Sequence, residues 1–181
     1  MKKISFSWLL LLSIWIVSGC QKDSLDCPPD LPCATQTGEN IFGCYINGKP
    51  WVAHVEPYVL DPAAHKIEAS YDETDYGSFN DNYVRLLGVY RGDTSSSLII
   101  HFKPLLRAGR IVMDSLIFHG IEFQTPHKHY EIDEASPYEI DVTKLDLEKN
   151  IISATFSFTG VSDTDTIKVT DGRLDVRYYP E

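Results

Sequence analysis

One short stretch of the sequence brings potential metal ligands close together. His127, His129 and Glu131 alternate along the chain, so they would project to the same side of an extended strand. Two imidazoles and a carboxylate are suitable zinc ligands, and a fourth ligand could come from His119 or Glu122. A proline precedes the stretch and favours a loop, in which these residues would be solvated polar groups. The stretch therefore raises a zinc hypothesis, but the sequence predicts no metal site.

Three other short motifs could bind a cation or a receptor, but each is also typical of a turn. Residues 72–75 and 162–166 are rich in acidic residues, and calcium prefers carboxylate oxygens. Neither segment has the spacing of an EF-hand loop, and a charged hairpin tip accounts for both. Arg91-Gly92-Asp93 matches the integrin-binding tripeptide, yet Gly-Asp is also a common turn pair. We predict turns at all three positions.

Catalytic motifs are missing from the sequence. It contains no Gly-x-Ser-x-Gly, no His-Glu-x-x-His, no Cys-x-x-Cys and no glycine-rich phosphate loop. We therefore predict no catalytic residue and no cofactor, and a role in binding or in envelope structure. Two alternatives stay open. One is a polysaccharide-active β-sandwich enzyme with acid and base residues converging in a cleft, and the other is a lipocalin-like carrier of a small ligand.

Aromatic residues are the best candidates for contacts with a ligand. They make up 12% of the chain, and several fall in predicted loops. Exposed rings stack on sugars or line apolar pockets, so a glycan is one candidate for an extracellular or periplasmic ligand. The same rings could instead pack the core and close the ends of the fold. They include Trp51, Tyr58, Tyr71, Tyr76, Phe79, Tyr83, Tyr130, Tyr138, Tyr178 and Tyr179.

The first twenty residues indicate export and lipidation. Two lysines precede a mostly apolar stretch of 14 residues, and Val17-Ser18-Gly19-Cys20 ends it. This pattern is typical of a signal peptide, since a transmembrane helix needs about 20 apolar residues. Its last four residues resemble the lipobox of bacterial lipoproteins. The resemblance implies that residues 1–19 are removed and that Cys20 carries a thioether-linked diacylglycerol, which anchors the protein in a membrane.

The residues after Cys20 predict where the protein is displayed. Gln21-Lys22-Asp23 resembles the signal that sends lipoproteins of the Bacteroidetes to the cell surface, although Ser24 stands where another acid is usual. We expect an outer-membrane protein at the cell surface, with the periplasmic face as the alternative. Residues 20–37 are polar and proline-rich, and we predict a tether that reaches about 50 Å when extended. Residues 38–181 are predicted to form one domain.

Charge excludes one class of partner. Without residues 1–19 the chain has 162 residues, of which 14 are basic and 26 acidic, so its net charge is −12 with neutral histidines. Such a surface repels phosphate backbones, which argues against nucleic-acid binding. It also repels anionic lipid headgroups, so we expect the lipid on Cys20 to be the contact with the membrane.

Three cysteines remain besides Cys20. Cys27 and Cys33 flank a short proline-rich loop, and they are the preferred disulfide in an oxidising compartment. The sequence cannot show whether their sulfurs meet, because three prolines restrict the loop. Cys44 lies in a strand pattern, where a buried and unreactive thiol is common.

Short β-strand patterns cover the rest of the chain. Asn47-Gly48 is a strong signal for a type I′ hairpin, and Pro50 indicates that its second arm is an edge strand. Strict alternation over residues 152–158 predicts a core strand with an apolar face and a wet hydroxyl face. We predict an all-β fold, an antiparallel β-sandwich or flattened β-barrel of roughly 8–10 strands. The predicted strands are residues 41–46, 50–54, 66–71, 83–90, 97–102, 117–123, 138–145, 151–159 and 166–178.

Three segments of the domain resemble one group of proteins. Residues 35–49, 152–158 and 170–176 are similar to Bacteroidetes lipoproteins catalogued as a domain of unknown function. Leu174 departs from the pattern, in which phenylalanine is more usual, and this affects packing only. The resemblance implies an envelope lipoprotein and assigns no catalytic or ligand-binding residue.

Overall fold

All regular structure in the described part of the chain is β-strand. The computed structural model describes residues 27–55, 66–72, 83–92, 94–102, 108–111 and 118–180. These residues contain no helix that is long and apolar enough to cross a membrane. The strands are β1 (Ile41–Ile46), β2 (Lys49–Val52), β3 (His54–Val55), β4 (Ile67–Asp72), β5 (Tyr83–Arg91), β6 (Ser95–Phe102), β7 (Gly109–Ile111), β8 (Phe118–Gln124), β9 (His129–Ile132), β10 (Glu139–Asp146), β11 (Ile151–Val161), β12 (Thr166–Arg177) and β13 (Tyr179–Pro180).

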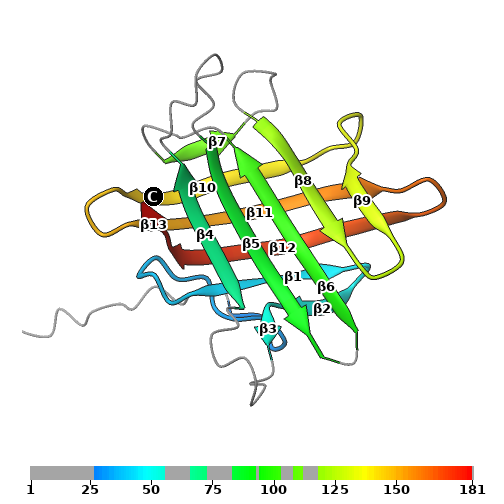
Figure 1. The fold of residues 1–181 in the computed structure, drawn as a ribbon, viewed down its shortest axis with the longest axis horizontal. Helices are drawn as coiled ribbons and strands as arrows, with labels where there is room; N and C mark the ends of the chain where they lie inside the picture. The colour runs from blue at the N-terminus through cyan, green and yellow to red at the C-terminus, as the bar shows by residue number, and fades with distance from the viewer. Residues whose placement is uncertain are drawn as a thin grey trace, which may run out of the picture.

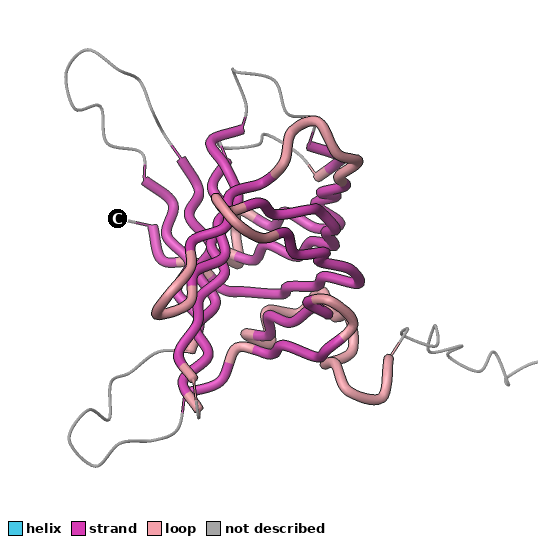
Figure 2. Tube along the Cα trace, turned by 90° about the vertical axis from the view of Figure 1, so that its right-hand side faces the viewer, coloured by secondary structure: helices cyan, strands magenta, loops and turns pink. Residues whose placement is uncertain are grey.

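The strands form one curled sheet whose halves face each other. Its order is β13-β4-β5-β6-β8-β9-β11-β12-β1-β2, with β10 beside β11 and β7 beside β10. In Figure 1, β4, β5, β6 and β8 form the front layer, and β11, β12 and β1 cross behind them. Figure 2 shows the same layers from the side. The all-β prediction is confirmed, and the curled antiparallel sheet is consistent with a β-sandwich or flattened barrel.

The corners of the fold are made by short strands. β9 links the layers because it pairs with β8 and also with the end of β11. β3 and β13 pair in parallel with β5 and β4. The sequence predicted a loop at β9 and no strand at β7. Such strands are too short to show a hydrophobic period, and pairing with their neighbours stabilises them.

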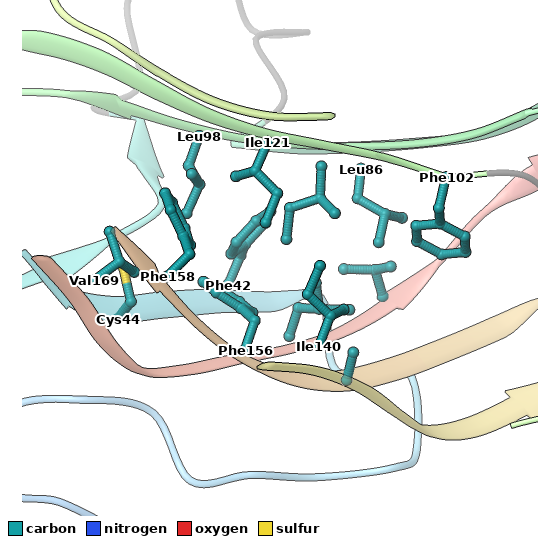
Figure 3. Close-up of a cluster of buried hydrophobic side chains, with 14 of the residues drawn as sticks. Phe42, Cys44, Leu86, Leu98, Phe102, Ile121, Ile140, Phe156, Phe158 and Val169 are labelled. Carbon is teal, nitrogen blue, oxygen red and sulfur yellow. The ribbon is translucent and has the colours of Figure 1, made fainter. Parts of the chain in front are cut away.

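Aliphatic and aromatic side chains fill the interior between the layers. In Figure 3, Leu98 and Ile121 extend from the front layer toward Phe42 and Phe158 of the rear layer. Phe42 also meets Phe156 edge to face, with 5.7 Å between ring centroids. The described interior is thus filled by side chains.

The first hairpin has the predicted geometry. Asn47 and Gly48 both have positive φ, 51° and 75°, as a type I′ turn requires. The following strand, β2, is at one end of the sheet order, so Pro50 lies on the predicted edge strand. An edge position tolerates proline because its missing N–H leaves no ladder bond unmade.

The wet face predicted for residues 152–158 is partly covered. Ile152, Ala154, Phe156 and Phe158 are buried on the inner face, as predicted, but Ser153 on the opposite face is only 1% exposed. Residues 27–40, which we call the N-terminal segment, make the contacts with this outer face. In the predicted organisation most of this segment was part of a free tether. In the structure it contacts the sheet from Leu31 and Pro32 onward.

Candidate functional site

One buried carboxylate attaches the N-terminal segment to the sheet. Asp175 on β12 is fully buried. Its carboxylate accepts hydrogen bonds from the backbone N–H groups of residues 37–39, at 2.8 to 3.0 Å. It also accepts hydrogen bonds from the hydroxyls of Thr35, at 2.6 Å, and Ser153, at 2.8 Å. These five donors satisfy the carboxylate from within the chain.

The same contacts keep Asp175 ionised. Burial alone would raise its pKa, but the hydrogen bonds from Thr35, Glu39 and Ser153 favour the charged form, and the net effect lowers the pKa. Sequence reasoning missed this residue. Asp175 alternates with arginines at positions 173 and 177 along the strand, so the pattern places it on a polar face and does not indicate its burial.

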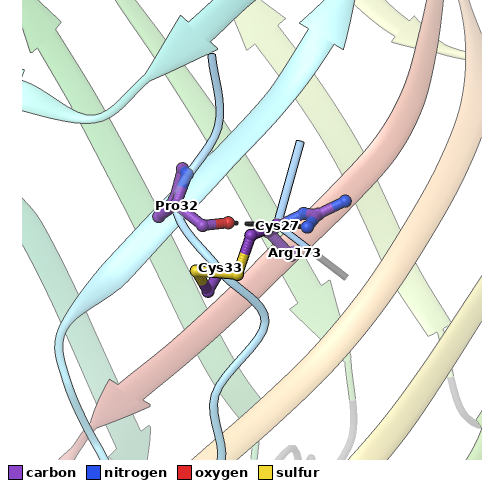
Figure 4. The surroundings of a disulfide bond; sticks show 4 residues. All are labelled: Cys27, Pro32, Cys33 and Arg173. Atoms are coloured by element: carbon purple, nitrogen blue, oxygen red, sulfur yellow. Dashed lines mark hydrogen bonds between the residues drawn. A yellow bond between two sulfur atoms is a disulfide. The ribbon is translucent and has the colours of Figure 1, made fainter. Parts of the chain in front are cut away.

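A disulfide closes the beginning of the N-terminal segment. Cys27 and Cys33 are bonded to each other, with 4.3 Å between their Cα atoms. Next to it, the carbonyl of Pro32 accepts a hydrogen bond of 3.5 Å from Nη1 of Arg173 on β12, as Figure 4 shows. Leu31 within the loop is buried. The disulfide loop therefore packs against the domain.

Of the other two cysteines, Cys44 lies within the described residues and Cys20 does not. Cys44 is a buried free thiol, and burial raises its pKa to about 12. A thiol with so high a pKa is unreactive at neutral pH, because the thiolate is the nucleophile. Cys20, the predicted lipidation site, lies outside the described residues.

The residues of the zinc hypothesis form no ligand cluster among the described side chains. His129 and Glu122 lie on neighbouring strands, with 3.4 Å between Nε2 and Oε2. His127 and Glu131 are exposed. No group of three or more potential ligands occurs in the described part of the chain, and the side chain of His119 lies outside that part.

The acidic turn at residues 162–166 is held by other side chains. The Asp165 carboxylate accepts hydrogen bonds from Lys128 Nζ, at 2.6 Å, and from the Tyr130 hydroxyl, at 3.0 Å. The Lys128 ammonium lowers the pKa of Asp165. This carboxylate is therefore already paired with a cation of the chain. Residues 73–75 and Asp93, from the other two motifs, lie outside the described residues.

A groove at one end of the sandwich is the best candidate for a ligand site. Three turns form it: those joining β1 to β2, β5 to β6, and β8 to β9. It has a volume of about 670 Å³, within the range of small-molecule sites. We call it the aromatic groove. Its lining includes Ile46, Lys49, Pro50, Trp51, Tyr90, Thr94, Ser95, Ser96, Phe123, Thr125, Pro126 and His127.

Trp51 is fixed at the inner wall of the aromatic groove. Its Nε1 donates a 2.9 Å hydrogen bond to the Ser96 hydroxyl. Its ring meets Phe42 and Phe123 edge to face, with centroids 6.0 and 6.2 Å away. Gly88 makes room for this packing, since a Cβ there would come within 2.8 Å of Phe42 and 3.1 Å of Trp51. The wall of the groove is therefore preorganised.

Tyr90 and several hydroxyl groups form the more accessible part of the aromatic groove. Tyr90 is half-buried, and its hydroxyl lies against Gly92, so a larger residue at 92 would displace it. Ser95 and Thr94 bring hydroxyls from the same hairpin, and exposed His127 brings an imidazole from the β8–β9 turn. Aromatic faces beside hydroxyl donors and acceptors can bind a sugar ring by stacking and hydrogen bonding.

Comparisons with known proteins assign no family to this arrangement. No protein-family model, no curated protein and no solved structure matches the chain. The resemblance of residues 35–49, 152–158 and 170–176 to Bacteroidetes lipoproteins accordingly stays a prediction.

Proposed function

We propose that this chain is a lipid-anchored binding protein of the bacterial outer membrane, displayed at the cell surface, whose aromatic groove binds a saccharide. The groove carries the proposal. Half-buried Tyr90 and the buried Trp51 line it with aromatic rings, and the hydroxyl-bearing residues Ser95 and Thr94 are part of the same lining. Saccharides have both apolar ring faces and a dense set of hydroxyls, and this lining complements both.

The expected position of the lipid supports a role close to the membrane. Because Cys27 is attached to the folded domain, only seven residues of chain length separate it from Cys20. Seven residues span at most about 25 Å. A lipid on Cys20 would therefore hold the domain much nearer to the bilayer than the 50 Å tether expected from sequence.

A second candidate is a polysaccharide-cleaving enzyme, and one observation favours it. Tyr90 and His127 both line the aromatic groove. Tyrosine and histidine can act as acid and base in such a cleft. If this function is correct, His127→Ala abolishes polysaccharide cleavage, whereas the binding proposal expects no cleavage by the unaltered protein.

The saccharide proposal is tested with a glycan array probed by the full chain in a non-ionic detergent. We expect a reproducible saccharide ligand, and Tyr90→Ala should weaken its binding about tenfold. Leu147→Ala is the control, because Leu147 is an exposed apolar residue that lines neither this groove nor the other cavity described below. Absence of a saccharide ligand, or equal loss in both variants, would refute the proposal.

The anchor is tested separately in cells. Cys20→Ala should move the protein from the membrane to the soluble fraction, since the acyl chains provide the membrane affinity. Protease shaving of intact cells tests the surface location. Retention of Cys20→Ala at the membrane would contradict the anchor, and protection from the protease would place the domain in the periplasm.

A further inference from the structure

A second cavity has a different chemistry from the aromatic groove. It has a volume of about 430 Å³ and lies where β4 and β5 meet the end of β12, β13 and the N-terminal segment. We call it the basic pocket. Its polar lining includes Lys66, Arg85, Arg177, Glu68, Ser70 and Asn40.

Three cations and one carboxylate line the basic pocket. Its formal charge is therefore positive, although the chain carries a net charge of −10. The aromatic groove has one lysine or arginine in its lining, Lys49. A small cavity that collects positive charge on an acidic protein focuses a field that attracts anions.

The charges of the basic pocket are weakly compensated. Lys66 is exposed, and its side chain makes no hydrogen bond or ion pair with another described residue. Arg85 has a 3.9 Å contact with Glu68, which is long for an ion pair. Arg177 donates to the carbonyls of Gly38, at 3.3 Å, and Thr37, at 3.2 Å, and these neutral acceptors leave its charge uncancelled.

An aromatic ring stands beside these cations. Tyr179 on β13 lines the basic pocket and is 77% exposed. It pairs in register with Ser70 of β4, which places it next to the strand that carries Glu68 and begins directly after Lys66. A solvated ring beside cationic groups fits a ligand that has both a ring to stack and an acidic group to pair.

We propose that the basic pocket binds an acidic sugar, with Lys66 and Arg85 pairing with its carboxylate or phosphate and Tyr179 stacking on its ring. A uronic acid and a sugar phosphate share this chemistry. Arg177 adds positive charge to the site while it holds the N-terminal segment. The site is separate from the aromatic groove, so it could be occupied whether or not the groove binds a saccharide.

The test is isothermal titration calorimetry on the full chain in non-ionic detergent, with glucuronate, glucose 6-phosphate, glucose and inorganic phosphate as probes. Glucuronate or glucose 6-phosphate should bind, and glucose should bind at least about tenfold more weakly because it lacks the charged group. Binding should weaken as salt is added. Equal binding of glucose and both acidic sugars, or binding of neither acidic sugar, would overturn the proposal.

Substitutions of the lining residues test whether the acidic sugar binds in the basic pocket. Lys66→Gln/Arg85→Gln should weaken binding of the acidic sugar about tenfold or more. Glu68→Gln should tighten its binding, because the variant removes a repulsive carboxylate. Lys168→Gln/Arg110→Gln is the matched control, because it removes one lysine and one arginine at exposed positions that line neither cavity. An equal loss in both double variants would overturn the assignment.

Two tyrosine variants complete the test. Tyr179→Ala should weaken binding of glucose 6-phosphate but leave binding of inorganic phosphate unchanged, because only the sugar has a ring. Equal losses would overturn the stacking role. Tyr90→Ala should leave acidic-sugar binding intact, so failure of the aromatic groove as a saccharide site is distinguishable from failure of the basic pocket.

Discussion

The outer face of β12 and the aromatic groove both carry polar side chains outside the apolar interior, but these side chains find their hydrogen-bond partners in different ways. Around Asp175, five donors from the chain itself saturate one carboxylate. In the groove, the hydroxyl-bearing residues Ser95 and Thr94 share the lining with Tyr90, and the Trp51 indole donates a hydrogen bond to Ser96.

The difference separates polar groups that stabilise the fold from polar groups that can bind a ligand. A carboxylate saturated by its own chain has no capacity left for a ligand, and its removal leaves donors unsatisfied. Groups at the rim of an open groove cost little to remove, but they can pair with a ligand. Substitutions around Asp175 should therefore change stability, whereas substitutions at Tyr90 should change binding.

Asp175→Ala should have the largest effect on stability. It removes the acceptor for five buried or partly buried donors, and we expect a loss of about 3 kcal/mol in the free energy of unfolding. Urea denaturation of the full chain in detergent measures it. Asp163→Ala, at an exposed turn position, is the control and should cost less than about 0.5 kcal/mol.

Acid should weaken the same attachment. Since the pKa of Asp175 is lower in the folded protein than in the unfolded chain, its carboxylate stabilises the fold above the ordinary aspartate pKa of about 3.9. That stabilisation is lost as the pH falls through the unfolded value toward the lower folded one. Urea titrations between pH 6 and pH 3 should show a smaller decrease in Asp175→Asn. An identical decrease would contradict this role.

Loss of the disulfide should have the next largest effect. Cys27→Ser/Cys33→Ser should lower the free energy of unfolding by about 2 kcal/mol, because the closed loop is short. Limited proteolysis should then cut the N-terminal segment before the sheet. If the double variant is as stable and as protected as the unaltered protein, the loop does not contribute to the attachment.

Thr35→Ala should give the smallest of these losses, about 1 kcal/mol, because four other donors to Asp175 remain. A double-mutant cycle with Asp175→Asn measures the coupling. Additive losses would mean that Thr35 stabilises the segment independently of Asp175.

Local sequence signals predicted the strands of both layers well. Burial of one face of a strand makes apolar and polar residues alternate along the sequence, and this alternation can be recognised. Residues 152–158 and the Asn47-Gly48 turn are examples in which the pattern depends on neighbours in sequence. β9 and the covered outer face at Ser153 were not predictable in this way. Both depend on pairing with distant segments, and the polar pattern around Asp175 does not indicate that its face is covered.

Neither cavity could be assembled from the sequence. The aromatic groove combines residues 46–51, 94–96 and 123–127 with Tyr90, which lay in a predicted strand. Trp51 and Tyr179 were singled out as aromatic residues, but composition does not show that one is a fixed wall and the other an exposed ring. That distinction follows from tertiary packing.

The most direct test of the account is to measure saccharide affinity and unfolding free energy together, in Tyr90→Ala and Asp175→Asn. We predict that Tyr90→Ala weakens binding about tenfold with a stability change below about 0.5 kcal/mol, while Asp175→Asn is destabilised and, under folding conditions, keeps its affinity. Unchanged affinity in Tyr90→Ala, together with weakened binding in folded Asp175→Asn, would contradict the assignment of the aromatic groove as the ligand site.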